Sequence, residues 1–203
     1  MKNRQTKVIN VFMSLLMLGM VMTGIVGCKS ENPATTQTST ATQTQTSIDT
    51  TVVLTITKGT QTKTYSLTEL KALTSITGYS GTKNKTGVIT GPMPYKGVAL
   101  TNVLNALGGI PANGSVKFTA KDGYSKTLTY DQITNTTFTT YDKSGNAANP
   151  EKTPVVFLAY EADGKALDDA TGPVQLAIMT CQNQVTDGSN FVKMIEKIEV
   201  IAP

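Results

Sequence analysis

Histidine and tryptophan are absent from the 203 residues of this chain, and cysteine occurs only twice. Without histidine, the chain cannot build a Ser-His-Asp or Cys-His catalytic site, a histidine zinc site or a histidine-ligated haem. Without tryptophan, recognition by large aromatic surfaces depends on seven tyrosines and five phenylalanines. Hydrolases that depend on histidine are therefore excluded.

Positive charge is also scarce once the first residues are set aside. The formal net charge is +4, with 18 Lys and Arg against 14 Asp and Glu. Lys2, Arg4 and Lys7 lie in a segment that we expect to be removed, which leaves 15 lysines against 14 acids. Because no basic excess remains to neutralise phosphates, we expect no nucleic-acid partner. The hydrophobic share of 39% predicts one domain of roughly 150 residues.

The start of the chain has the features of a bacterial lipoprotein signal. A basic head (1–7) precedes a largely apolar stretch (8–26) that ends at Gly27 and Cys28. Ile25-Val26-Gly27-Cys28 resembles the lipobox, in which the cysteine becomes the lipidated first residue of the mature protein. The alternative is an uncleaved transmembrane anchor, because about 19 apolar residues can just span a bilayer. We expect a signal peptide over 1–27, lipidation at Cys28 and an extracytoplasmic, membrane-anchored protein.

Residues 28–50 form a second region of distinct composition. Threonine, serine and glutamine dominate it, and apolar side chains that could build a core are missing. We expect a flexible tether with a root-mean-square span of about 25 Å. Its hydroxyl groups are also compatible with a glycosylated stalk.

Residues 51–203 carry the patterns of a folded domain made of short strands. Strands are expected at Val52–Ile56, 63–65, 116–120, 127–129, 155–160, 174–178 and near the end of the chain, within 192–201. Residues 74–90 are weakly patterned and rich in glycine, so a loop is expected there. Residues 133–150 are polar and are expected to form an excursion, that is, a loop that extends away from the core of the domain. The fold class is therefore α+β and rich in β, with few short helices.

Two short helices are expected between these strands. Ser66 and Glu69 have the spacing of a capping box at a helix start. Residues 100–107 place Leu100, Val103, Leu104 and Leu107 on one apolar stripe, with glycine available for the C-terminal cap. The strand after it, with Val116, Phe118 and Ala120 in alternation, leads into an Asp-Gly turn signal.

Four sequence runs resemble the molybdopterin-binding domain of sulfite-oxidase-type oxidoreductases. They are Tyr95-Lys96-Gly97-Val98-Ala99-Leu100, then 116–124 with its Asp122-Gly123-Tyr124, then Gly172-Pro173-Val174-Gln175-Leu176, and finally Val192-Lys193-Met194-Ile195 with Ile198-Glu199-Val200. The resemblance covers roughly residues 51–201 and rests on structural positions. It implies the fold of that domain and a site for a molybdenum-pterin cofactor.

The resemblance also implies which positions face the cofactor. The family's metal-binding cysteine comes just before the helix of residues 100–107, and here Tyr79 and Ser80 stand in that neighbourhood. Soft thiolate sulfur suits the metal, whereas hydroxyl oxygen does not. Cys181 is the one cysteine of the folded domain and does not match the ligand's place in chain order.

The residues that bind the pterin phosphate in the family are also mostly replaced in this sequence. Its histidine position corresponds to Ala170 or Thr171 and its arginine to Gln175, while Lys193 matches the family's lysine. Arginine, histidine and lysine are the usual set because a buried dianion needs charge-assisted donors. We therefore expect Lys193, Tyr79, Ser80 and Gln175 to occupy the ligand-binding positions, without a metal ligand.

Three other groups have a structural and a functional interpretation. Asp122-Gly123-Tyr124 is expected as a hairpin turn, with a site formed by the aspartate as base and the tyrosine as donor as the alternative. Cys181 is expected as a buried inert thiol, with a redox or metal role as the alternative. Asp168-Asp169 with Asp163 is expected as solvated surface, with cation binding as the alternative.

The resulting hypothesis is a lipid-anchored, extracytoplasmic protein with a molybdopterin-oxidoreductase-like domain. This domain is expected to bind no cofactor and to act as a non-catalytic binding or structural module. Its expected partners are the membrane, through lipidated Cys28, and an unknown small ligand or a membrane redox partner. The alternative is a molybdopterin-dependent oxidoreductase with an atypical cofactor site that uses Cys181 or backbone groups. A cleft adapted to another small molecule is the third possibility.

Overall fold

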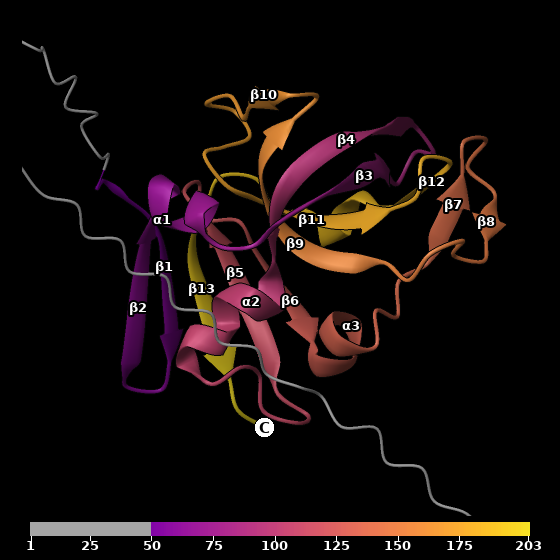
Figure 1. The fold of residues 1–203 in the computed structure, drawn as a ribbon. Coiled ribbons are helices and arrows are strands. Elements are labelled where there is room, and N and C mark those ends of the chain that lie inside the picture. Colours follow the sequence, from indigo (N-terminus) through magenta and orange to yellow (C-terminus); the bar gives the residue numbers. More distant parts are fainter. Residues whose placement is uncertain (1–49) are drawn as a thin grey trace, which may run out of the picture. The chain divides into compact units, whose positions relative to one another are not determined.

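The computed structural model describes residues 50–203, which fold into two β-sheets with short helices between their strands (Figure 1). The predicted signal peptide (1–27), Cys28 and the tether up to residue 49 lie outside the described residues. In the described part of the chain, no helix is long and apolar enough to cross a membrane. The expected fold class, β-rich α+β with few short helices, is confirmed.

The first sheet joins the two ends of the folded domain. Its strands are β2 (Gln61–Ser66), β1 (Val52–Lys58), β13 (Ile195–Ile201), β5 (Ser115–Ala120) and β6 (Ser125–Thr129), hydrogen-bonded in that order. β1 runs parallel to β13, with Ile56 opposite Ile198, and the other pairs are antiparallel. The alternation of Val116, Phe118 and Ala120 is confirmed as the buried face of β5.

The expected helices form where the sequence places them. α1 (Leu67–Ala72) starts with a complete capping box, because the Ser66 hydroxyl accepts from the Glu69 N–H and the Glu69 carboxylate accepts from the Ser66 N–H. α2 (Leu100–Leu104) continues into the 3₁₀ turn η1 (Asn105–Leu107) and ends at Gly108, whose φ of 74° suits glycine.

One further helix was not expected. α3 (Tyr130–Thr134) begins with a second capping box, made by Thr129 and Gln132. The predicted polar excursion that follows contains a small hairpin of β7 (Thr140–Asp142) and β8 (Ala147–Ala148), visible at the right of Figure 1.

The second sheet contains the strands that surround the site described below. Besides β7 and β8 it consists of β3 (Ser75–Lys83), β4 (Ile89–Ala99), β9 (Val155–Ala162), β10 (Lys165–Ala166), β11 (Gln175–Thr180) and β12 (Gln184–Asp187). The 3₁₀ turn η2 (Gly188–Asn190) follows β12. β4 and β11 each pair with both β3 and β9, so these four strands close a ring.

The prediction of a loop over residues 74–90 is wrong, because most of this segment belongs to β3 and β4. At Gly81 the chain packs closely, because a Cβ there would lie 2.7 Å from the Thr90 carbonyl oxygen. This glycine is therefore required by strand packing and does not indicate a free turn.

The hydrophobic interior is divided along β9. Val156, Leu158 and Tyr160 belong to the larger cluster, which also includes side chains from β1, β5, β11, β13, α1 and α2. Phe157 and Ala159, together with Ala177 of β11, form a smaller cluster on which Tyr95 and Phe191 pack. Both faces of β9 are buried, which explains its continuous apolar sequence.

Candidate functional site

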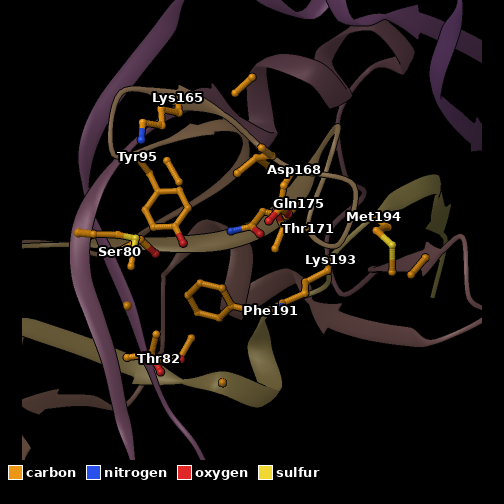
Figure 2. Close-up of a pocket in the computed structure, with 18 of the residues that line it drawn as sticks. Ser80, Thr82, Tyr95, Lys165, Asp168, Thr171, Gln175, Phe191, Lys193 and Met194 are labelled. Carbon is orange, nitrogen blue, oxygen red and sulfur yellow. The ribbon is translucent and has the colours of Figure 1, made fainter.

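A pocket of about 800 Å³ lies next to the smaller hydrophobic cluster. Strands β3, β4 and β11, the loop of residues 165–171 and the segment 188–194 contribute its lining, and the β5–β6 turn reaches its rim. Sites for small molecules typically have volumes of about 300–1,000 Å³ and combine apolar walls with a few polar groups. Figure 2 shows side chains from these segments converging on one space.

The first strand position of β11 provides the most unusual polar group of this pocket. Gln175 is only 5% exposed, and its amide faces the pocket (Figure 2). No group among residues 50–203 forms a hydrogen bond with this amide. Among the described residues, the Thr186 hydroxyl is the side-chain group that is fully buried without a partner, so the Gln175 amide keeps contact with the solvent of the pocket. The Gln175 amide is therefore free to bind a ligand.

Ser80 lies near Gln175 but is already engaged. It is fully buried in β3, and its hydroxyl donates to the Ile178 carbonyl at 2.7 Å. This bond ties β3 to β11 in the part of the ring where their backbones have only two paired positions. The Ser80 hydroxyl has thus used its hydrogen, and toward the pocket it offers only acceptor capacity.

Two aromatic rings approach the Gln175 amide from different segments. Tyr95 of β4 stands edge to face against Phe157, with ring centroids 6.3 Å apart and an interplanar angle of 80°. Phe191, which follows η2, packs against both hydrophobic clusters. In Figure 2 the Tyr95 hydroxyl, the Gln175 amide and the Phe191 ring face the same space. The rings are held by packing, so they are fixed before a ligand arrives.

The rim of the pocket carries balanced charge. Lys165 and Lys193 lie on it together with Asp122 and Asp168. The Thr171 hydroxyl donates to the Asp168 carboxylate, which is the largest cause of the lowered pKa of Asp168, and attraction by Lys193 also contributes. Asp168 is therefore held in its charged form, and the rim has no net positive field.

The structure brings together three of the four predicted ligand-binding residues. Ser80, Gln175 and Lys193 all line the pocket. Tyr79 does not, because neighbouring residues of a strand point to opposite faces and Ser80 takes the pocket side. Thr171, one of the two positions assigned to the family's histidine, also lines the pocket.

Cys181 lies away from this pocket, just after β11. Its side chain is a free thiol and the residue is 8% exposed. The sulfur is 3.3 Å from Glu151 Oε2 and 3.5 Å from Gln184 Oε1, and it does not line the pocket. The expectation that Cys181 is buried is confirmed.

The predicted turn at Asp122-Gly123-Tyr124 is confirmed as the link between β5 and β6. Asp122 Oδ1 accepts from the Tyr124 N–H at 3.0 Å, and Gly123 has a φ of 86°. Asp122 and Tyr124 also reach the pocket rim, so the turn has both a structural role and a place at the site. Of the three predicted surface acids, only Asp168 lines the pocket, and Asp163 occupies the β9–β10 turn.

The lining does not fit the molybdenum-pterin group that the sequence resemblance implies. Such a group needs a soft sulfur donor and fixed cationic donors for its phosphate. No cysteine, histidine or arginine lines the pocket, and its two lysines are opposed by two aspartates. No reaction step at this pocket is therefore assigned to that cofactor.

The two aromatic lining residues described above, Tyr95 and Phe191, were not predicted as site residues. Tyr95 stands in one of the four runs that resemble the molybdopterin-binding domain, but that run indicated only the fold and gave no reason to place Tyr95 at the site. Phe191 follows a polar segment that gives no pattern signal. Both were missed because their roles depend on strands and turns that lie far apart in the sequence.

No family model and no curated protein sequence matches this chain. Among solved structures, the chain is similar to the sulfane dehydrogenase SoxCD from Paracoccus pantotrophus, with 17% sequence identity and a TM-score of 0.47. The match covers 73% of this chain and 37% of that chain, so it spans little more than a third of the neighbour's length.

Proposed function

We propose that this chain is a lipid-anchored extracytoplasmic protein whose domain binds a small molecule without transforming it. The anchoring part is supported by the basic head, the apolar stretch and the Cys28 motif at the start of the sequence. The Thr-, Ser- and Gln-rich tether would then hold the domain away from the bilayer.

The observation that carries the binding function is the unpartnered Gln175 amide inside a pocket of about 800 Å³. A protein that had no ligand for this position would gain stability from an apolar residue there. Binding without turnover is supported by the lining of the pocket, in which no cysteine, histidine or arginine occurs.

Native mass spectrometry of the full chain in detergent tests the proposal. We expect wild type to carry a co-purified small molecule or to recover one from a concentrated host extract. Thr82→Trp, which fills the pocket from β3, should lose it. Thr62→Trp on the exposed surface of β2 is the matched control and should retain it. If wild type and Thr82→Trp never differ in bound mass, the binding function is wrong.

The anchoring part has its own test. Metabolic labelling with a radioactive fatty acid should mark the wild-type chain and leave Cys28→Ser unlabelled. Equal labelling of both chains, or none of either, would contradict lipidation at Cys28.

The alternative function is a molybdopterin-dependent oxidoreductase with an atypical site. It is favoured by the order and spacing of the four runs between Tyr95 and Val200. It predicts stoichiometric molybdenum by elemental analysis of the purified chain, and an absorption band that disappears in Cys181→Ser. A metal-free, colourless protein from cells supplied with molybdate would exclude it.

A further inference from the structure

The chemistry of the pocket defines what kind of molecule it can hold, and this inference rests on the binding function proposed above. Gln175 supplies a neutral carboxamide, with a donor (Nε2) and an acceptor (Oε1) side by side. Because the amide lines the pocket and forms no hydrogen bond within the described chain, both atoms are available to a ligand. The matching group carries an acceptor next to a donor, as a lactam or a primary carboxamide does.

The walls add a second requirement. Phe191 offers a ring face that is fixed by its contacts with both hydrophobic clusters. The Tyr95 ring is fixed against Phe157, with its hydroxyl toward the space that Gln175 faces (Figure 2). A flat ring stacked on an aromatic side chain gains about 0.5–1.5 kcal/mol beyond the burial of its area. A planar ligand can therefore use Phe191 while its edge reaches Gln175.

The charges set a third condition. Two lysines and two aspartates share the rim, and Lys193 and Asp168 attract each other. A phosphate or carboxylate at the depth of Gln175 would meet a neutral amide and no guanidinium. Transfer of an unpaired anion to such a position is unfavourable. The ligand group at Gln175 is therefore uncharged.

We propose that the pocket binds an uncharged planar ring with a lactam or carboxamide edge, held edge-on by the Gln175 amide and face-on by Phe191. The ligand class includes pyridones, pyrimidinones and aromatic carboxamides. Ser80 also lines the pocket, and because its hydroxyl donates to the Ile178 carbonyl it can only accept a hydrogen bond from the ligand.

Three small probes of similar size test this proposal by ligand-observed NMR on the full chain in detergent. 2-Pyridone has the donor and acceptor edge, N-methyl-2-pyridone lacks the donor, and benzoate is an anion. We expect 2-pyridone to bind about tenfold more tightly than either of the others, which corresponds to the loss of one hydrogen bond worth about 1.4 kcal/mol.

Gln175→Met keeps the length of the side chain and removes the amide, so it should abolish the preference for 2-pyridone. Gln182→Met changes an exposed glutamine of the β11–β12 turn and should preserve the preference. Equal binding of the three probes, preference for benzoate, failure of all three to bind, or an unchanged preference in Gln175→Met would each overturn the inference. The Thr82→Trp comparison with co-purified ligand is independent of these outcomes, so the binding function can stand if this ligand class fails.

Discussion

Two buried glutamines at the starts of β11 and β12, which follow one another in the sequence, differ in how their side chains are bonded. Gln184, at the start of β12, is 3% exposed; its Nε2 donates to the Asn149 carbonyl at 2.6 Å and its Oε1 accepts from the Glu151 N–H at 3.0 Å. Gln175, at the start of β11, is 5% exposed, and its amide has no such bond to any residue of the described domain. The first amide holds a loop in place, whereas the second is available to something outside the chain.

This difference distinguishes polar groups that stabilise the fold from polar groups that are available to bind a ligand. Ser66, Ser80 and Lys58 are buried or half-buried polar groups that form hydrogen bonds within the described domain. Removing such a group should lower stability, while removing a binding group should lower only affinity. The five predictions below test this separation, from the largest expected change to the smallest.

Gln184→Met should cause the largest loss of stability. It leaves the Asn149 carbonyl and the Glu151 N–H without their partner at a partly buried site. We expect a loss of about 1–3 kcal/mol in the free energy of unfolding, measured by urea denaturation. A loss below about 0.5 kcal/mol would remove the basis of the comparison with Gln175.

Lys58→Met should have the next largest effect. The Lys58 ammonium donates to the carbonyls of Leu107, Gly108 and Gly109, at 3.1, 3.3 and 2.9 Å, where η1 ends. Methionine keeps the apolar stem but leaves these carbonyls to water, so we expect a loss of about 1–2 kcal/mol by the same assay. Lys85→Met, at an exposed loop position, is the control and should change stability by less than about 0.5 kcal/mol.

Ser66→Ala should cost about 1 kcal/mol, because it removes the side-chain half of the capping box of α1. Thr129→Ala removes the corresponding half of the box of α3 and should cost a similar amount. Thermal unfolding of both variants measures the two effects. A destabilised Ser66 variant beside an unaffected Thr129 variant would mean that only one of the two boxes contributes to stability.

Glu69→Gln should change the pH dependence of stability. The N–H of Ser66 donates to the Glu69 carboxylate, which lowers the pKa of Glu69. The folded pKa therefore lies below the unfolded one, so this contribution is present above the unfolded pKa of about 4.3 and is lost as the pH falls through the folded pKa.

Because Gln132 occupies the same box position in α3, glutamine at position 69 should retain the hydrogen bond without titrating. Urea denaturation at several pH values should show a smaller loss of stability on acidification in this variant than in wild type. An identical acid dependence in both chains would contradict the assignment.

Gln175→Met should have the smallest effect on stability. No intramolecular hydrogen bond of the described chain is lost, so we expect a change within about 0.5 kcal/mol, or a slight gain. The difference in stability loss between Gln175→Met and Gln184→Met is the most direct test of the comparison between the two glutamines. A loss as large as that of Gln184→Met would mean that Gln175 is a structural residue.

The sequence predicted those parts of the fold whose physics is local. Alternation at Val116, Phe118 and Ala120, and the Ser66 and Glu69 box, depend on neighbours within a few residues. β3 was missed because Gly81 is required by a contact with the backbone of Thr90, which lies in another strand. The composition of β3 alone resembles that of a loop.

The site could be predicted only where the resemblance marked the position. Gln175 and Lys193 stand in two of these runs and line the pocket, whereas Tyr79 and Ser80 were proposed only from the family's chain order, and of these two Ser80 lines the pocket. The absence of a partner for the Gln175 amide is a property of the assembled chain. It could not be inferred from the residue type.

The closed ring of β3, β4, β9 and β11 affects whether copies of this protein can pair through the edges of their sheets. The free ends of the two sheets fall on β2, β6, β8 and β10, of which β8 and β10 have two residues each. Lys63 lies on β2 and Lys126 on β6. Short or lysine-bearing edges are poor templates for strand exchange between molecules, so a β-rich domain of this kind can be crowded on a surface with little tendency to aggregate.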